Sequence, residues 1–250
     1  MWIAIPSYNL PVTLQKKTLR MLRKNLVPAD KVVVFVASEE QCEEYLQYAD
    51  PEWCPAFVVG RPGIHAQRSY IHNYWPAGTK VLCLDDDVSN IKRPFQAEMP
   101  LLELFERCFA IAERERCALW GIYPSDHGLS LKDRAVVGLT YIIGACYGIV
   151  AGSDPLQYAD PFTEDFTRSV EFYKRGLGVL RFEGMGPTTR YFKEPGGLQS
   201  FRTPESQEAQ MVAFAEKYPA DATLRKRPGK MTDVRLERKV GRTIQAPFAA

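Results

Sequence analysis

Apolar residues in the first ninety positions alternate between the spacing of a strand and that of a helix. Short apolar runs, several of them rich in β-branched residues, predict buried strands at residues 2–5, 31–37, 56–59 and 81–84. Between them, helices are predicted at residues 13–26, from Ser38 onward and at 64–74. This order predicts an α/β fold with a Rossmann-like, mainly parallel sheet flanked by helices.

The loops that follow the four predicted strands meet at one edge of such a sheet. They comprise residues 6–8, 37–38, 60–63 and 85–87. Ligands of open parallel sheets bind outside the carboxyl ends of the strands. The sequence therefore predicts one ligand site built from these four loops.

The second half of the chain is less regular. Helices are predicted at 101–116, 166–174 and after Thr203, and strands at 136–141, 147–150 and 179–182. We expect one domain at 1–215, made of a half at 1–90 that carries the predicted ligand site and a smaller, mixed half at 91–215. From residue 216 the chain loses its apolar period, which predicts a partly ordered basic extension over 216–250.

Composition indicates an ordinary protein of the cytoplasm. Of the 250 residues, 46% are hydrophobic and 25% charged, and no apolar run approaches the roughly 20 residues of a membrane-spanning helix. The six cysteines show no close Cys-x-x-Cys pair, and the N-terminus has no secretion signal. We therefore expect a soluble cytoplasmic protein with reduced thiols and no membrane partner.

Basic residues cluster in two places although the net charge is only +2. The first predicted helix carries five Lys and Arg residues, and residues 216–250 hold nine against four acids. Either patch could contact phosphate groups, or both could be solvated surface.

Three consecutive aspartates, Asp85, Asp86 and Asp87, follow the fourth predicted strand. Carboxylates at this spacing repel one another, and strand or helix propensity gives no reason for them. A divalent cation removes the repulsion, because carboxylate oxygens are preferred ligands of Mg²⁺ and Mn²⁺. A solvated acidic turn or a helix cap is the alternative explanation.

Three segments resemble the GT-A class of glycosyltransferases: IPSYN at 5–9, the loop and helix carrying Arg68, and VLCLDDDV at 81–88. The resemblance implies a UDP-sugar donor, most readily UDP-glucose, with Mn²⁺ or Mg²⁺. It implies that Pro6, Ser7, Tyr8 and Ser38 surround the uracil, that Asp85 and Asp86 lie on the donor side, and that Asp87, with Asp85, binds the metal. Arg68 would lie near the base or the diphosphate.

A Glu164-Asp165 pair opens a predicted helix, as a similar pair does in inverting GT-A enzymes. An acceptor hydroxyl must lose its proton during attack, and a nearby carboxylate can accept it. We expect Asp165 to be this base, with Glu164 as the competitor. Acidic residues are also common in first turns of helices for electrostatic reasons alone.

A narrower resemblance is to the TET/JBP-associated glycosyltransferases, found largely in bacteriophages. It rests on Ile3–Pro11, Tyr141–Ile149 and Thr189–Gln199 and spans about residues 1–215. It implies transfer of a hexose to the hydroxymethyl group of a 5-hydroxymethylpyrimidine in DNA, by an inverting mechanism. The alternatives are a glycan, lipid-linked or protein acceptor, or a non-catalytic nucleotide-sugar or DNA-binding module.

Several residues in these segments have two interpretations. Glycines can permit close approach of a ligand or form tight turns, and aromatic residues can stack on a sugar or base or fill the core. Lys193 could neutralise the leaving diphosphate beside a flexible glycine pair. The donor-side glycines are Gly196 and Gly197, and the acceptor-side candidates are Gly144, Tyr147, Gly148 and Trp120, with Tyr123 as a further aromatic.

Overall fold

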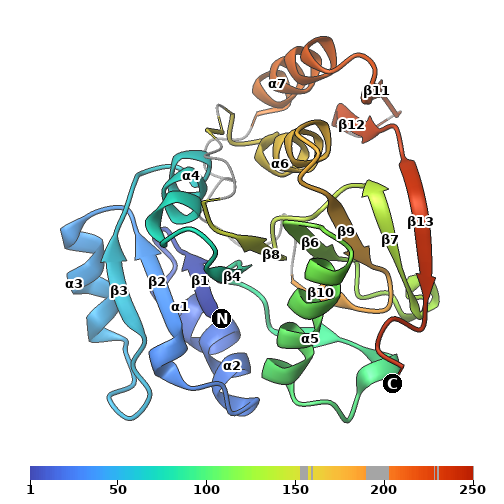
Figure 1. Ribbon diagram of the computed structural model, residues 1–250. Helices are drawn as coiled ribbons and strands as arrows, with labels where there is room; N and C mark the ends of the chain where they lie inside the picture. Colours follow the sequence, from blue (N-terminus) through green and yellow to red (C-terminus); the bar gives the residue numbers. More distant parts are fainter. Residues whose placement is uncertain (153–156, 159, 190–202, 228, 230, 250) are drawn as a thin grey trace.

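The computed structural model describes residues 1–152, 157, 158, 160–189, 203–227, 229 and 231–249. In this part of the chain a nine-stranded sheet has the order β13-β7-β9-β6-β8-β4-β1-β2-β3. Its four neighbours β4-β1-β2-β3 are all parallel and lie to one side in Figure 1. These strands are β1 (Trp2–Pro6), β2 (Val32–Val36), β3 (Ala56–Val59) and β4 (Lys80–Leu84). The predicted parallel half of the sheet is confirmed.

The helices of this half connect the parallel strands as predicted. They are α1 (Pro11–Leu14), a π-helical turn (Gln15–Leu19), α2 (Arg20–Lys24), α3 (Glu39–Gln47) and α4 (Ile64–Tyr74). The helix predicted from Ser38 onward begins with Ser38 as its N-cap, because the Ser38 side chain accepts a hydrogen bond from the Gln41 amide. A short 3₁₀ turn (Ala29–Lys31) leads into β2.

The other half of the sheet is mixed, because antiparallel β8 joins it to β4. Its strands are β6 (Leu119–Ile122), β7 (Arg134–Leu139), β8 (Cys146–Val150) and β9 (Val179–Phe182). Its helices are α5 (Leu101–Arg114), α6 (Glu164–Lys174) and α7 (Pro204–Lys217), and 3₁₀ turns lie at Pro94–Gln96 and Gly128–Ser130. A separate ribbon pairs β5 (Asn90–Lys92) with β10 (Gly186–Thr188).

The segment expected as a partly ordered basic extension, 216–250, contributes strands that pair and pack with the rest of the fold. An antiparallel hairpin of β11 (Ala222–Arg225) and β12 (Asp233–Leu236) packs on α7, and β13 (Lys239–Gln245) pairs with β7 at the sheet edge. Most side chains of β13 are exposed. An edge strand is held by backbone hydrogen bonds, so it needs no apolar period that a sequence pattern could reveal.

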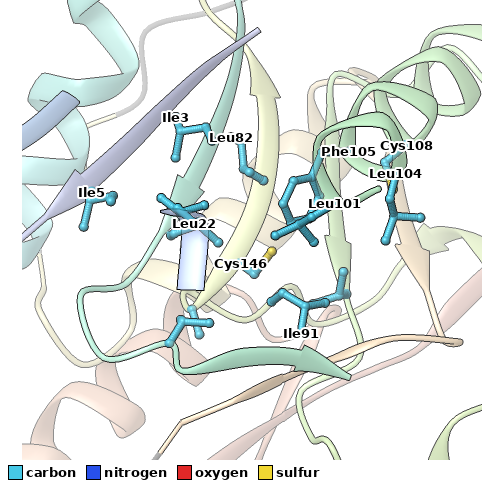
Figure 2. Packing of buried hydrophobic residues seen from close by; sticks show 14 of the residues in the cluster. Ile3, Ile5, Leu22, Leu82, Ile91, Leu101, Leu104, Phe105, Cys108 and Cys146 are labelled. Carbon is cyan, nitrogen blue, oxygen red and sulfur yellow. The ribbon is translucent and has the colours of Figure 1, made fainter. Parts of the chain in front are cut away.

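Helices cover both faces of the sheet (Figure 1). Buried residues of α1, α2 and α5 pack on one face, and buried residues of α4 and α6 pack on the other. Figure 2 shows the first of these cores, in which Leu22 of α2 and Phe105 of α5 lie near Ile3 and Leu82 of the sheet. Among the described helices none is long and apolar enough to span a bilayer. The two-sided cover leaves the carboxyl ends of the strands accessible.

Candidate functional site

A large cleft opens at the carboxyl ends of β1 and β4, with a volume of about 1530 Å³. Pockets for a single small ligand typically have volumes of about 300–1,000 Å³, so this one has room for two substrates. Its walls come from both halves of the chain, the first through the loops after β1, β3 and β4. The second half contributes the start of α6, the loop after β7 and the β11–β12 hairpin.

The loop after β1 is tied to the acidic loop after β4. Ser7 donates to Asp86 (Oγ to Oδ2, 2.5 Å) and is hydrogen-bonded to the Tyr45 hydroxyl at 2.8 Å. Burial raises the pKa of Asp86 to about 7, with further contributions from the Asp85 and Asp87 carboxylates. Pro6, Ser7, Tyr8 and all three aspartates line the cleft, so the structure brings together the predicted donor-side residues of these two loops.

Thr18 is hydrogen-bonded to the backbone of the acidic loop. Its hydroxyl donates to the Asp85 carbonyl (2.7 Å) and accepts from the Val88 amide (2.9 Å), and the residue is fully buried. Thr18 lies in the π-helical turn, a distortion that is often found at functional sites. The sequence pattern did not indicate Thr18, because a threonine within a helical period looks like an ordinary interior position.

Arg68 joins the two walls of the cleft. Its guanidinium group contacts Asp85 (Nη2 to Oδ1, 2.6 Å) and Glu164 (Nη1 to Oε1, 3.0 Å), and only 4% of the residue is exposed. Burial alone would lower the pKa of Arg68, but the Glu164 and Asp85 carboxylates hold it well above its usual value. Gly144 makes room for this group, because an added Cβ would come within 3.0 Å of it.

Glu164 is held between two arginines. Its second oxygen contacts Arg168 (Nη1 to Oε2, 2.8 Å), whose side chain is fully buried. The Arg168 guanidinium also lies over the Tyr147 ring, 3.8 Å from its centre, and donates to the Ile142 carbonyl at 3.2 Å. With Arg68 on one oxygen and Arg168 on the other, both oxygens of the Glu164 carboxylate are engaged in ion pairs within the protein.

Asp165, the next residue, has the opposite environment. It accepts a hydrogen bond from the Tyr141 hydroxyl and another from the Phe166 amide (2.9 Å), and it lines the cleft. Burial, together with the negative charge of Glu164, raises the pKa of Asp165 to about 6. A carboxylate with a pKa near neutrality, at the cleft surface, is suited to general base catalysis.

Three of the four acceptor-side candidates lie in the core, which corrects their expected place at a ligand. Trp120 is 1% exposed and packs against Phe105, Phe109 and Phe182. Tyr147 is fully buried, and its hydroxyl is 3.1 Å from His72 Nε2. The third, Gly148, pairs with Trp120 in the sheet and leaves room for its ring. Only Gly144 lines the cleft.

Replacing Gly148 with alanine is expected to destabilise the fold by about 1–3 kcal/mol, because the new Cβ would overlap the Trp120 ring in a closed core. Urea unfolding followed by fluorescence measures the change. Gly241→Ala in exposed β13 is the matched control, since its nearest atom would be 3.7 Å away, and we expect a change within about 0.5 kcal/mol. Equal stability of the two variants would contradict this account of Gly148.

Ser38, predicted on the donor side, is not part of the cleft wall. Ser38 serves as the N-cap of α3, and its neighbour Ala37 lines the cleft in its place. Lys193, Gly196 and Gly197 lie outside the described residues.

Known proteins resemble this chain in structure only. No protein-family profile and no curated protein matches its sequence. Glucosyl-3-phosphoglycerate synthase from Mycobacterium tuberculosis, in complex with Mn²⁺, uridine diphosphate and phosphoglyceric acid, superimposes with a TM-score of 0.52 at 10% identity, over 98% of this chain and 89% of that one. Mannosyl-3-phosphoglycerate synthase from Rubrobacter xylanophilus gives 0.50 at 11% identity, over 98% and 86%. The fold is that of the GT-A nucleotide-sugar transferases.

The three aspartates after β4, predicted as metal and donor ligands, line the cleft. Within the described residues no three His, Cys, Asp or Glu side chains converge as a metal site. Asp85 is paired with Arg68 and Asp86 with Ser7. These aspartates would supply a cation with only a few carboxylate oxygens. That suits Mg²⁺, which usually takes most of its ligands from water and substrate phosphates.

This GT-A cleft also carries basic residues that the sequence pattern did not assign to the site. They come from β9 and from the β11–β12 hairpin with its flanking residues: Arg181, Arg225, Arg227, Arg235 and Arg238. The basic tail was visible in the sequence. Its position over the cleft follows from the pairing of β13 with β7 and of the hairpin with α7.

Proposed function

We propose that this protein is a glycosyltransferase that moves a hexose from a UDP-sugar to the hydroxymethyl group of a 5-hydroxymethylpyrimidine in DNA, with inversion at the sugar. UDP-glucose is the first donor to test. One observation carries the proposal: a single cleft holds the acidic loop on one wall and Asp165 on the other, joined through Arg68 and Glu164. In this cleft a sugar donor would be bound at the acidic loop, and the acceptor hydroxyl would lie against Asp165.

The chemistry requires one proton transfer and one displacement. Asp165 accepts the proton of the acceptor hydroxyl as its oxygen bonds to the anomeric carbon, and the bond from that carbon to the diphosphate breaks. Tyr141 orients the carboxylate through its hydrogen bond. Asp87 and Asp85 would hold Mn²⁺ or Mg²⁺, which supplies positive charge to the leaving diphosphate. Ser7 and Thr18 keep the acidic loop in place.

A DNA acceptor is supported by the charge of the cleft. Four arginines of the C-terminal segment, Arg225, Arg227, Arg235 and Arg238, line the wall near α7. Guanidinium groups bind phosphates in bidentate fashion, and DNA carries a phosphate at every nucleotide. The affinity for DNA should therefore fall steeply with rising salt, and a base in a duplex would have to be flipped out or met single-stranded.

The acceptor class is tested by incubating the protein with UDP-glucose, Mn²⁺ and DNA with or without hydroxymethylpyrimidines. Transfer only to hydroxymethylated DNA supports the proposal. Release of UDP with no DNA product would favour a glycan, lipid-linked or protein acceptor. No turnover with any donor would indicate a non-catalytic nucleotide-sugar or DNA-binding module.

A second candidate is a small phosphorylated acceptor. The Mycobacterium synthase that shares the fold was solved with phosphoglyceric acid, and the arginines of this cleft would suit such an anion as well. Adding phosphoglyceric acid as a separate acceptor in the same assay distinguishes the two, because only one arm would yield a glycosylated product.

Asp87→Ala is expected to weaken metal-dependent donor binding by at least about tenfold, since a cation bridging protein and diphosphate would lose a carboxylate ligand. Calorimetric titration of UDP with and without Mn²⁺ measures this. Asp30→Ala, at an exposed position of a 3₁₀ turn, is the control and should bind UDP as the wild type does. Unchanged Mn²⁺-dependent affinity in Asp87→Ala would remove Asp87 from the donor site.

A further inference from the structure

A second charged cluster lies on the side of the cleft formed by β9 and the end of β12. Glu183, which is 3% exposed, contacts three arginines: Arg134 (Nε to Oε2, 2.6 Å), Arg181 (Nη2 to Oε1, 2.7 Å) and Arg238 (Nη2 to Oε1, 2.9 Å). Three guanidinium charges thus face one carboxylate, which leaves the cluster with a net charge of about +2. Arg181 and Arg238 share the same oxygen of Glu183 and are therefore held side by side.

Two of these arginines face the cleft and the third does not. Arg181 and Arg238 line it, as does Tyr123, whose ring lies under the Arg181 guanidinium at 5.5 Å. Arg134 contacts the same carboxylate but is not part of the cleft wall. Glu183 thus holds two arginines that face the cleft and one that does not.

Arg181 is buried at a cost that its protein partners do not fully offset. The residue is 8% exposed, and its Nε is buried without a hydrogen-bond partner among the described residues. Burial lowers the pKa of Arg181, although the hydrogen bond to Glu183 opposes this. A desolvated cation beside a second cation would be stabilised by an anion in the cleft.

Tyr141 connects the cluster to Asp165, the proposed base. Arg181 Nη1 donates to the Tyr141 carbonyl (3.2 Å), and the Tyr141 hydroxyl donates to Asp165. A group bound by Arg181 would thus lie on the same side of the cleft as Tyr141 and the proposed base. Glycosyl acceptors need such an anchor, because the hydroxyl must be held against the base in a defined orientation.

We propose that Arg181 and Arg238 form a phosphate-binding subsite for the sugar acceptor, with Tyr123 beside it. Its ligand is a phosphate group, borne by the backbone of a nucleic acid or by a small phosphorylated acceptor. The inference rests on the proposed function only in assigning that phosphate to the acceptor. The planar guanidinium pair presents forked donors that match phosphate oxygens, which lysine could not do.

Binding is tested on the full chain without any sugar donor, so that no turnover is required. The probes are a short labelled single-stranded DNA, followed by anisotropy, and phosphoglyceric acid, followed by calorimetry, with inorganic phosphate as competitor. Arg238→Gln is expected to weaken at least one probe by about tenfold or more. With the DNA probe, the slope of log affinity against log salt concentration should also become shallower by about 0.7 for each phosphate contact that is lost.

Arg134→Gln is the matched control. It removes the positive charge of another arginine that contacts Glu183, and it leaves the cleft wall unaltered. It should bind both probes within about twofold of the wild type. Arg181→Gln should resemble Arg238→Gln, with thermal melting checking that it folds. Arg238 itself is 43% exposed, so its replacement leaves the fold intact.

The affinities of the variants for the two probes distinguish the sources of the phosphate and test the subsite itself. Weakened DNA binding in both cleft variants supports a nucleic-acid phosphate, and weakened phosphoglyceric acid binding supports a small acceptor. Wild-type affinity of Arg238→Gln for both probes, or an equal loss in Arg134→Gln, would overturn the subsite. Absence of glycosyl transfer with this order of affinities intact would refute the proposed function alone.

Discussion

Asp165→Asn is expected to lower glycosyl transfer by at least about a hundredfold while leaving UDP binding unchanged. General base catalysis typically contributes a factor of about 10² to 10⁴. The amide has nearly the same shape as the carboxylate and can still accept the hydrogen bond from Tyr141, but it cannot accept a proton. Single-turnover transfer and UDP titration, measured on the same preparation, separate the two effects.

The pH dependence gives an independent readout of the same group. Because Asp165 has a pKa raised to about 6, kcat/KM should increase with pH up to about 6 and level off above it. The Tyr141 hydrogen bond lowers this pKa, so Tyr141→Phe should move the acidic limb to higher pH. Full activity in Asp165→Asn would instead point to Glu164 as base or to a retaining reaction without one.

Replacing Arg68 with alanine is expected to destabilise the protein by about 3–5 kcal/mol, the largest stability effect in the site. The substitution removes the cation that lies between Asp85 and the buried Glu164. Removing one partner of a buried ion pair costs far more stability than removing one partner of an exposed pair. Urea unfolding monitored by circular dichroism measures the change, which is large against a typical total stability of about 5–15 kcal/mol.

An exposed ion pair provides the comparison for Arg68. Arg107 contacts Glu103 one helical turn away, and both side chains are nearly half exposed. Arg107→Ala should therefore change stability by no more than about 0.5 kcal/mol. If Arg68→Ala costs as little as this control, Arg68 does not hold the two walls of the cleft together.

The parallel half of the fold could be predicted from local pattern. Buried β-branched runs separated by helical periods reproduce β1 to β4 within a residue or two at most boundaries, because both elements are set by the spacing of apolar side chains. The aspartates follow β4 directly in the chain, so their place at the sheet edge followed from the strand alone. The end of the chain was different, since β13 is held by backbone pairing with β7.

The role of single residues within the cleft depended on contacts that sequence spacing cannot show. Glu164 and Asp165 are neighbours with the same functional group, yet Glu164 is paired with Arg68 and Arg168, whereas Asp165 accepts a hydrogen bond from Tyr141. Trp120 had two interpretations until its ring was found among Phe105, Phe109 and Phe182.

The amino-acid sequence was therefore sufficient to predict the α/β class, the parallel half of the sheet and the place of the acidic loop after its fourth strand, all of which follow from short-range periodicity and chain order. Tertiary structure alone decided which carboxylate is paired with arginines and which arginines line the cleft. The physical reason is that the charge state of a buried group depends on partners many residues away. Arg181 and Arg238 are 57 positions apart in the chain, yet both contact one oxygen of Glu183.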